Sequence, residues 1–97
     1  MSRDDILALL ELNRETLLRY SVRRLGLFGS FVRNAAGESS DLDFLVELEH
    51  KTFDNYMDLK FFLENLLGRR VDLVLADSLK PRLREPILRE VVHVQGF

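Results

Sequence analysis

The sequence contains no cysteine. Disulfide bonds, a thiolate nucleophile and zinc sites with sulfur ligands are therefore excluded, and a cytoplasmic location is expected. Long hydrophobic runs are also missing, since no uncharged stretch approaches the roughly 18–20 residues that cross a bilayer. The segment 1–12 carries acidic residues where a secretory signal has basic ones, so neither a signal peptide nor a membrane span is predicted.

The sequence also has no excess of positive charge. Its formal net charge is −2 and its isoelectric point is about 5.6. A duplex-binding protein displaces counterions with a broad basic surface, so direct nucleic-acid binding is not expected. An anionic ligand can still be held by a local cluster or through metal ions. The length of 97 residues, 46% of them hydrophobic, predicts a single domain over residues 1–97.

Helical and strand patterns alternate along the chain. An amphipathic helix is predicted over Ser2–Tyr20, with Ser2 as its N-cap. A second helix is predicted over Thr52–Leu67, with Gly68 as its C-cap. Its apolar residues exceed one stripe, which fits either a thoroughly buried core helix or contact with a partner or a second copy. Strands are predicted over Val22–Phe28, Asp41–Leu48, Val71–Ala76 and Val91–Val94.

Two further segments are predicted to be helical only in part. A short helix is expected over Phe31–Ala35, ended by Gly37. Pro81 and Pro86 each remove an N–H donor and should limit residues 79–89 to short helical pieces. The order of elements predicts an α/β domain of two layers, a mixed sheet with helices mainly on one face. The other face is expected to lie open to a ligand.

Three aspartates are predicted to share that open face. The second strand alternates, so Asp41 and Asp43 point away from its apolar side and lie about 6–7 Å apart. Asp72 has the same orientation in a later strand and joins them if the two strands are neighbours. Three such carboxylates are costly without a cation, and hard oxygen ligands suit Mg²⁺. They can hold two Mg²⁺ ions roughly 4 Å apart, an arrangement used in phosphoryl and nucleotidyl transfer.

A phosphate-binding turn is the matching prediction on the first strand. Gly29 lets the backbone approach a ligand, and free N–H groups where a strand turns into a helix attract anions. The Ser30 hydroxyl can add a hydrogen bond, and Arg33 can reach a phosphate from the next turn. Taken singly, each of these residues is more often an ordinary turn or surface residue. A fixed Gly-Ser, ten residues and Asp-x-Asp arise together by chance about once in a thousand chains of this length.

This combination resembles the signature of the nucleotidyltransferase (polymerase β-like) superfamily. The segments LFGSFVR and SDLDFLVEL resemble its minimal members, the MNT-domain proteins, and the likeness runs from the first strand to the last. The resemblance implies the fold of that superfamily, two Mg²⁺ ions and a nucleoside triphosphate donor. It implies catalytic and metal-binding roles for Asp41, Asp43 and Asp72, and nucleotide binding by Gly29, Ser30 and Arg33. One departure is Asn34, where the family often has glycine.

The resemblance also implies a partner. Minimal members typically act as antitoxins of a HEPN-domain RNase toxin and transfer AMP from ATP to one of its tyrosines. We expect the acceptor to come from a second molecule or subunit, because residues 1–97 leave no room for an acceptor-binding domain. The alternatives are an antitoxin that neutralises its partner by binding alone, and a nucleotidyltransferase that acts on a small molecule. A homo-oligomer also remains open.

Overall fold

The computed structural model describes residues 1–29, 31–32 and 41–97. Within these ranges, one four-stranded sheet has the order β3-β2-β1-β4. β1 is antiparallel to β2 and β4, whereas β2 and β3 are parallel. The predicted mixed sheet is therefore confirmed. Its strands are β1 (Val22–Phe28), β2 (Leu42–Leu48), β3 (Val71–Leu75) and β4 (Val92–His93).

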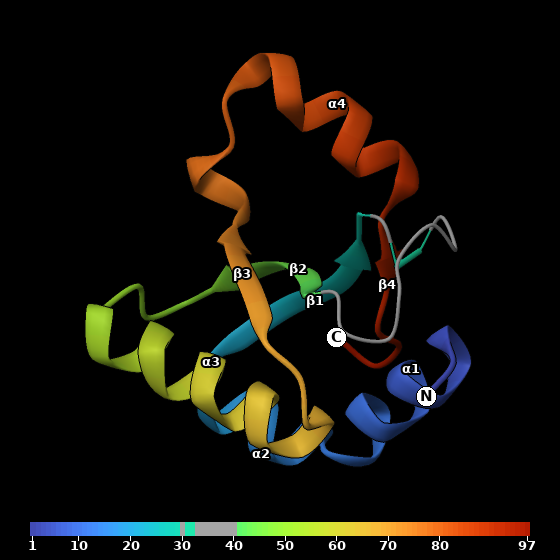
Figure 1. Cartoon of the computed structure of the whole chain (residues 1–97). Coiled ribbons are helices and arrows are strands. Elements are labelled where there is room, and N and C mark those ends of the chain that lie inside the picture. Colours follow the sequence, from blue (N-terminus) through green and yellow to red (C-terminus); the bar gives the residue numbers. More distant parts are fainter. Residues whose placement is uncertain (30, 33–40) are drawn as a thin grey trace.

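Four α-helices flank this sheet in the described part of the chain. They are α1 (Arg3–Leu12), α2 (Arg14–Arg19), α3 (Phe53–Leu67) and α4 (Pro81–Glu90), with a short 3₁₀ helix η1 (Ala76–Ser78) after β3. Figure 1 shows α1, α2 and α3 on one side of the sheet and α4 on the other. None of the helices in the described ranges combines the length and the hydrophobicity that crossing a membrane requires.

The first helical segment differs from the sequence prediction. Ser2 caps α1, and Asp5 completes a capping box with it, as its position predicts. The single helix expected over Ser2–Tyr20 is instead broken at Asn13. The Asn13 side chain donates to the carbonyl of Leu9 at 2.8 Å, one of the local hydrogen bonds through which asparagine competes with helical bonding. The break turns α2 so that its one buried residue, Leu17, reaches the core.

Helix α3 follows its prediction closely. Thr52 caps its N-terminus, and Gly68 ends it with a φ of 66° in the left-handed region. The side chains of Leu59, Leu63 and Leu67 are buried. The surplus of apolar residues lies partly outside the core, because Phe53 and Phe61 have 75% and 52% of their surface exposed.

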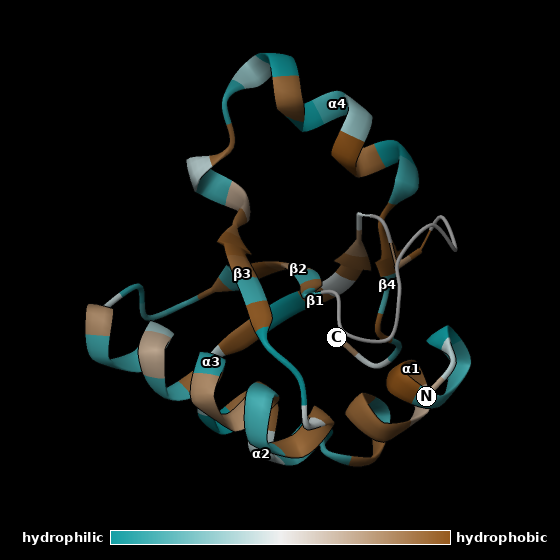
Figure 2. Ribbon diagram, viewed as in Figure 1, coloured by the Kyte–Doolittle hydropathy of each residue, from teal (hydrophilic) through white to brown (hydrophobic). Residues whose placement is uncertain are grey.

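The core lies between the sheet and helices α1, α2 and α3. Side chains at alternate positions of β2 face it, as the sequence alternation predicts. Figure 2 shows hydrophobic residues concentrated on the strands, whereas α4 is mixed along its length. The completely buried large side chains are Phe44, Ile6, Leu10, Leu17, Leu25, Leu27, Leu42, Leu59, Leu63 and Val46.

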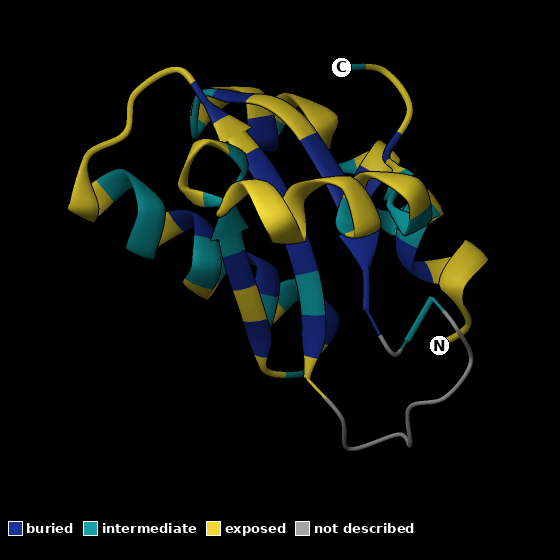
Figure 3. Cartoon of the chain, turned by 90° about the horizontal axis from the view of Figure 1, so that it is seen from above, coloured by how far each residue is buried: buried dark blue, intermediate teal, exposed yellow. Residues whose placement is uncertain are grey.

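The prediction of short helical pieces over residues 79–89 was wrong. The two prolines do not divide residues 81–90, which form one ten-residue helix. Pro81 occupies the first turn, where an N–H donor has no intrahelical partner in any case. Pro86 removes one interior hydrogen bond, and the helix continues through it. Figure 3 shows α4 as a largely exposed helix that crosses the second face of the sheet.

The second face is therefore less open than the sequence predicts. A Cβ on Gly26 of β1 would overlap Cγ2 of Val91, the residue that follows α4. Leu45 of β2 is 5% exposed, although it shares this face with Asp43 and Glu47. The middle of the face is covered, and what remains accessible includes its edge with the aspartates.

Candidate active site

Strand pairing brings Asp43 and Asp72 side by side. Asp43 of β2 pairs in parallel register with Asp72 of β3, and in antiparallel register with Phe28 of β1. Neighbouring strands lie about 4.8 Å apart, and paired residues present their side chains on the same face. The expectation that the strand of Asp72 adjoins the strand of Asp43 is confirmed.

Gly29 lies directly against Asp43. It follows β1, it is buried, and its φ of 82° lies in the left-handed region that favours glycine. A Cβ at this position would overlap the Oδ2 atom of Asp43. The glycine is therefore required twice, by the backbone conformation and by the close approach of the carboxylate. The predicted turn and the predicted acidic strand meet at this point.

Asp41 immediately precedes β2 and is exposed. The neighbouring Leu42 N–H donates to the carbonyl of Arg70 at 3.0 Å, which fixes the start of β2 beside the start of β3. Among the described residues, no three His, Asp or Glu side chains form a group that could hold a metal ion. The roles of Asp41, Asp43 and Asp72 as metal ligands therefore stay predictions.

Two predicted site residues, Ser30 and Arg33, lie outside the described residues. The same applies to Gly37 and to most of the short helix expected over Phe31–Ala35. Phe31 and Val32 are described and form a turn, in which the Val32 N–H donates to the Gly29 carbonyl at 3.1 Å. This hydrogen bond joins Val32 to Gly29 at the end of β1.

Tyr56 connects the site to helix α3. Its hydroxyl donates to the carbonyl of Leu73, the residue after Asp72 in β3. Burial, and in second place the negative charge of Asp72, raise the pKa of the Tyr56 hydroxyl. Tyr56 is therefore a protonated donor at neutral pH, and it holds the edge strand that carries Asp72.

Glu90 is a site residue that sequence reasoning missed. One of its carboxylate oxygens accepts a hydrogen bond from the Gly29 N–H at 3.0 Å. Glu90 is the last residue of α4 and lies 61 positions from Gly29 in the chain. No local motif marks it, because the contact depends on how α4 crosses the sheet.

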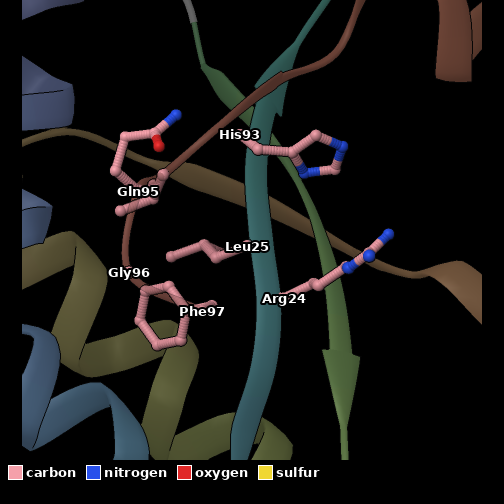
Figure 4. Close-up of a pocket in the computed structure, with 7 residues that line it drawn as sticks. Arg24, Leu25, His93, Gln95, Gly96 and Phe97 are labelled. Carbon is pink, nitrogen blue, oxygen red and sulfur yellow. The ribbon is translucent and has the colours of Figure 1, made fainter.

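The far half of the second face has a different character. Arg24 of β1 pairs with Glu47 of β2 in register, and their side chains form an exposed ion pair at 3.7 Å. Figure 4 shows Arg24 and His93 projecting from one side of β1, and Leu25 and Phe97 lying on the other. Arg24 and His93 thus share the face of Asp43. Arg24 lies beyond the covered middle and His93 borders it at Gly26, so neither belongs to the site.

Comparison with known proteins shows the family of this chain. The sequence profile of the nucleotidyltransferase domain matches residues 9–94. The chain belongs to this family. A nucleotidyltransferase relative, the protein adenylyltransferase MntA of Thermococcus cleftensis, is 46% identical over 82 residues, which cover 84% of this chain and 83% of the relative.

Solved structures of nucleotidyltransferases agree with the fold. A protein assigned as a minimal nucleotidyltransferase superposes with a TM-score of 0.81 at 42% identity, and the match covers 95% of each chain. A complex of tri-AMPylated Shewanella oneidensis HEPN toxin with its MNT antitoxin contains a chain that matches with a TM-score of 0.59 at 20% identity. This second match covers 90% of this chain and 72% of the other, and it shows likeness of fold alone. The α/β fold predicted from the resemblance is thereby confirmed.

The donor set at the site suits the metal that this family implies. Asp43 and Asp72 present carboxylate oxygens from neighbouring strands, and Asp41 lies two residues before Asp43. Mg²⁺ prefers oxygen ligands and is usually held by one or two carboxylates together with substrate phosphates and water. Two aspartates side by side, next to the Gly29 turn, would therefore fit Mg²⁺ better than a softer metal.

Proposed function

We propose that this nucleotidyltransferase is a Mg²⁺-dependent protein adenylyltransferase that modifies a HEPN RNase toxin and acts as its antitoxin. The observation that carries the proposal is the contact of the Gly29 turn with Asp43, which has Asp72 beside it in register. A phosphate-binding turn and two carboxylates at one point are what transfer from a nucleoside triphosphate requires. The 46% identity to a protein adenylyltransferase supports AMP as the group transferred.

The reaction joins an acceptor hydroxyl to the α-phosphorus of ATP. A new oxygen–phosphorus bond forms, the bond to the bridging oxygen of the leaving group breaks, and pyrophosphate departs. In the proposed mechanism the Gly29 N–H donates to a phosphate oxygen. Asp72 accepts the proton of the acceptor hydroxyl, a role implied by the family resemblance. Ser30 and Arg33 are proposed to bind the triphosphate with Gly29.

Asp41, Asp43 and Asp72 are the residues that would hold Mg²⁺. When bound there, Mg²⁺ would neutralise charge on the attacking and leaving oxygens. Asp43 is the central member of the set, because its carboxylate lies between the Gly29 backbone and Asp72. It aligns the carboxylate edge of the sheet with the phosphate-binding turn.

The location of Asp72 supports a macromolecular acceptor. Asp72 is exposed, and β3 is an outer strand of the sheet. A tyrosine on another protein can therefore approach it from solvent without entering a closed pocket. A cytoplasmic location, where ATP and Mg²⁺ are plentiful, goes with this proposal.

Intact-mass spectrometry of the candidate HEPN partner tests the proposal. The partner is incubated with this protein, ATP and Mg²⁺, and the Asp43→Asn variant serves as the control. We expect a mass gain of one or more AMP units with the native protein and none with the variant. If the native protein and the variant both form a stable complex with the partner, and neither causes a mass gain, the result would instead support an antitoxin that acts by binding alone.

A further inference from the structure

The carboxylate of Glu90 accepts a hydrogen bond from the Gly29 N–H. In the proposed function the same N–H donates to a phosphate oxygen. Gly29 has a single N–H group, and in this structure that group donates to Oε1 of Glu90 at 3.0 Å. Glu90 is half-buried, so its carboxylate is held partly away from water. A carboxylate oxygen therefore already occupies this donor.

Glu90 brings a second negative charge close to Gly29. Asp43 packs against the same glycine, so two carboxylates flank one residue, and like charges at short range repel. Glu90 is also the last residue of α4, and the C-terminus of a helix disfavours negative charge. A neutral glutamine has the same shape and can accept the same hydrogen bond. Glutamine therefore removes the charge of Glu90 while it can keep the hydrogen bond to the Gly29 N–H.

We propose that Glu90 is a built-in competitor for the triphosphate at the Gly29 amide and thereby sets the affinity of this protein for nucleotide. A phosphate oxygen that reaches the Gly29 N–H must replace Oε1 of Glu90. The Glu90 side chain then turns away, because its charge repels the phosphate. This inference rests on the proposed function, in which Gly29 binds the triphosphate.

Glu90 competes with a phosphate oxygen for one hydrogen bond and takes no part in the transfer reaction. Its carboxylate accepts a charge-assisted hydrogen bond, which is roughly twice as strong as a neutral one. Nucleotide binding therefore has to offset a stronger bond than a glutamine would make. Val91 packs over Gly26, and this contact at the end of α4 does not involve the Glu90 side chain.

Nucleotide titration of Glu90→Gln tests the proposal. Binding of the non-hydrolysable analogue AMP-PNP is measured by calorimetry in the presence of Mg²⁺. We expect the variant to bind about three- to tenfold more tightly than the native protein, since a charged acceptor is exchanged for a neutral one. Glu85→Gln is the matched control, because it removes the same charge from the same helix. Glu85 is exposed and pairs with Arg89, so its variant should bind as the native protein does.

The amide resonance of Gly29 gives a second readout that a purely structural role would not produce. In ¹⁵N-labelled protein this resonance should shift in Glu90→Gln, and it should shift again in both proteins when AMP-PNP is added. If the native protein binds the analogue and Glu90→Gln binds it equally or more weakly, the competitor role is wrong and the proposed function stands. If neither protein binds the analogue, the proposed function fails, and this inference fails with it.

Discussion

The two faces of β2 carry opposite kinds of residue. Toward α1, α2 and α3 the strand presents a continuous apolar row that is almost completely buried. On the other face an acid lies near each end, and the buried Leu45 lies between them. The first face holds the domain together, and the second places Asp43 beside Gly29 and Asp72. Neighbouring residues in the sequence therefore contribute to stability or to the candidate site, and mutations of single residues can separate the two effects.

The largest effect is expected from Asp43→Asn, on activity alone. Loss of several kcal/mol of transition-state stabilisation should lower AMP transfer about a thousandfold, because each 1.36 kcal/mol corresponds to a factor of ten. Thermal stability should change far less than activity, because asparagine has nearly the same size and shape as aspartate. Transfer rates and melting temperatures are compared with those of Asp58→Asn, an exposed control on α3. If the variant keeps a tenth or more of the native rate, the proposed metal-binding role of Asp43 is wrong.

The adjacent substitution Phe44→Ala should have the opposite effect. Phe44 is 0% exposed and lies in the centre of the core. Its truncation should lower the free energy of unfolding by about 3–5 kcal/mol, through lost burial and the cavity left behind. Urea unfolding measures this change. AMP transfer per folded molecule at low temperature should stay within about twofold of the native value. A large loss of activity in the folded variant would show that the two faces are not separable.

Gly29→Ala should affect both properties at the point where the second face meets β1. The substitution forces a side chain into the left-handed region, at a cost of about 1–2 kcal/mol, and adds an overlap with Asp43. Gly68→Ala is a close control, because its φ is 66° and no atom lies within 4 Å of the added Cβ. Both variants should lose stability in urea unfolding, but only Gly29→Ala should weaken AMP-PNP binding, by at least about tenfold. Equal binding by the two variants would contradict the proposed phosphate-binding turn.

The smallest effect concerns a region remote from both faces, the capping box of α1. Hydrogen bonds from the Ser2 backbone N–H and hydroxyl lower the pKa of Asp5 below its ordinary value of 3.8. A lowered pKa means that the ionised carboxylate stabilises the fold above about pH 4, and that this contribution is lost as the pH falls through the lowered pKa. Asp5→Asn should therefore lower the melting temperature slightly at pH 7 and have less effect near pH 2. Differential scanning calorimetry at the two pH values checks this, and a difference that does not depend on pH would refute it.

Much of the fold was predictable from local patterns. The bounds of β1 and the caps of α3 follow from strand alternation and from the residues that start and stop helices. The errors have local causes that a pattern does not weigh. Asn13 bonds back to Leu9 and divides a helix, whereas Pro86 is accommodated inside one. The asparagine interrupted a helix that the apolar spacing alone predicts to continue, whereas the proline did not interrupt one.

By itself the sequence determined which chemical groups are present and which face of a strand each occupies. Alternation in β2 separates Asp43 from the core, and Gly29 marks a turn, because both properties depend only on neighbours in the chain. The tertiary structure alone decided that Asp43 lies beside Asp72 and that Glu90 reaches the Gly29 amide. These contacts join distant parts of the chain through the α3 crossover and the passage of α4 over the sheet. Local periodicity cannot specify such contacts, because they depend on how whole elements pack.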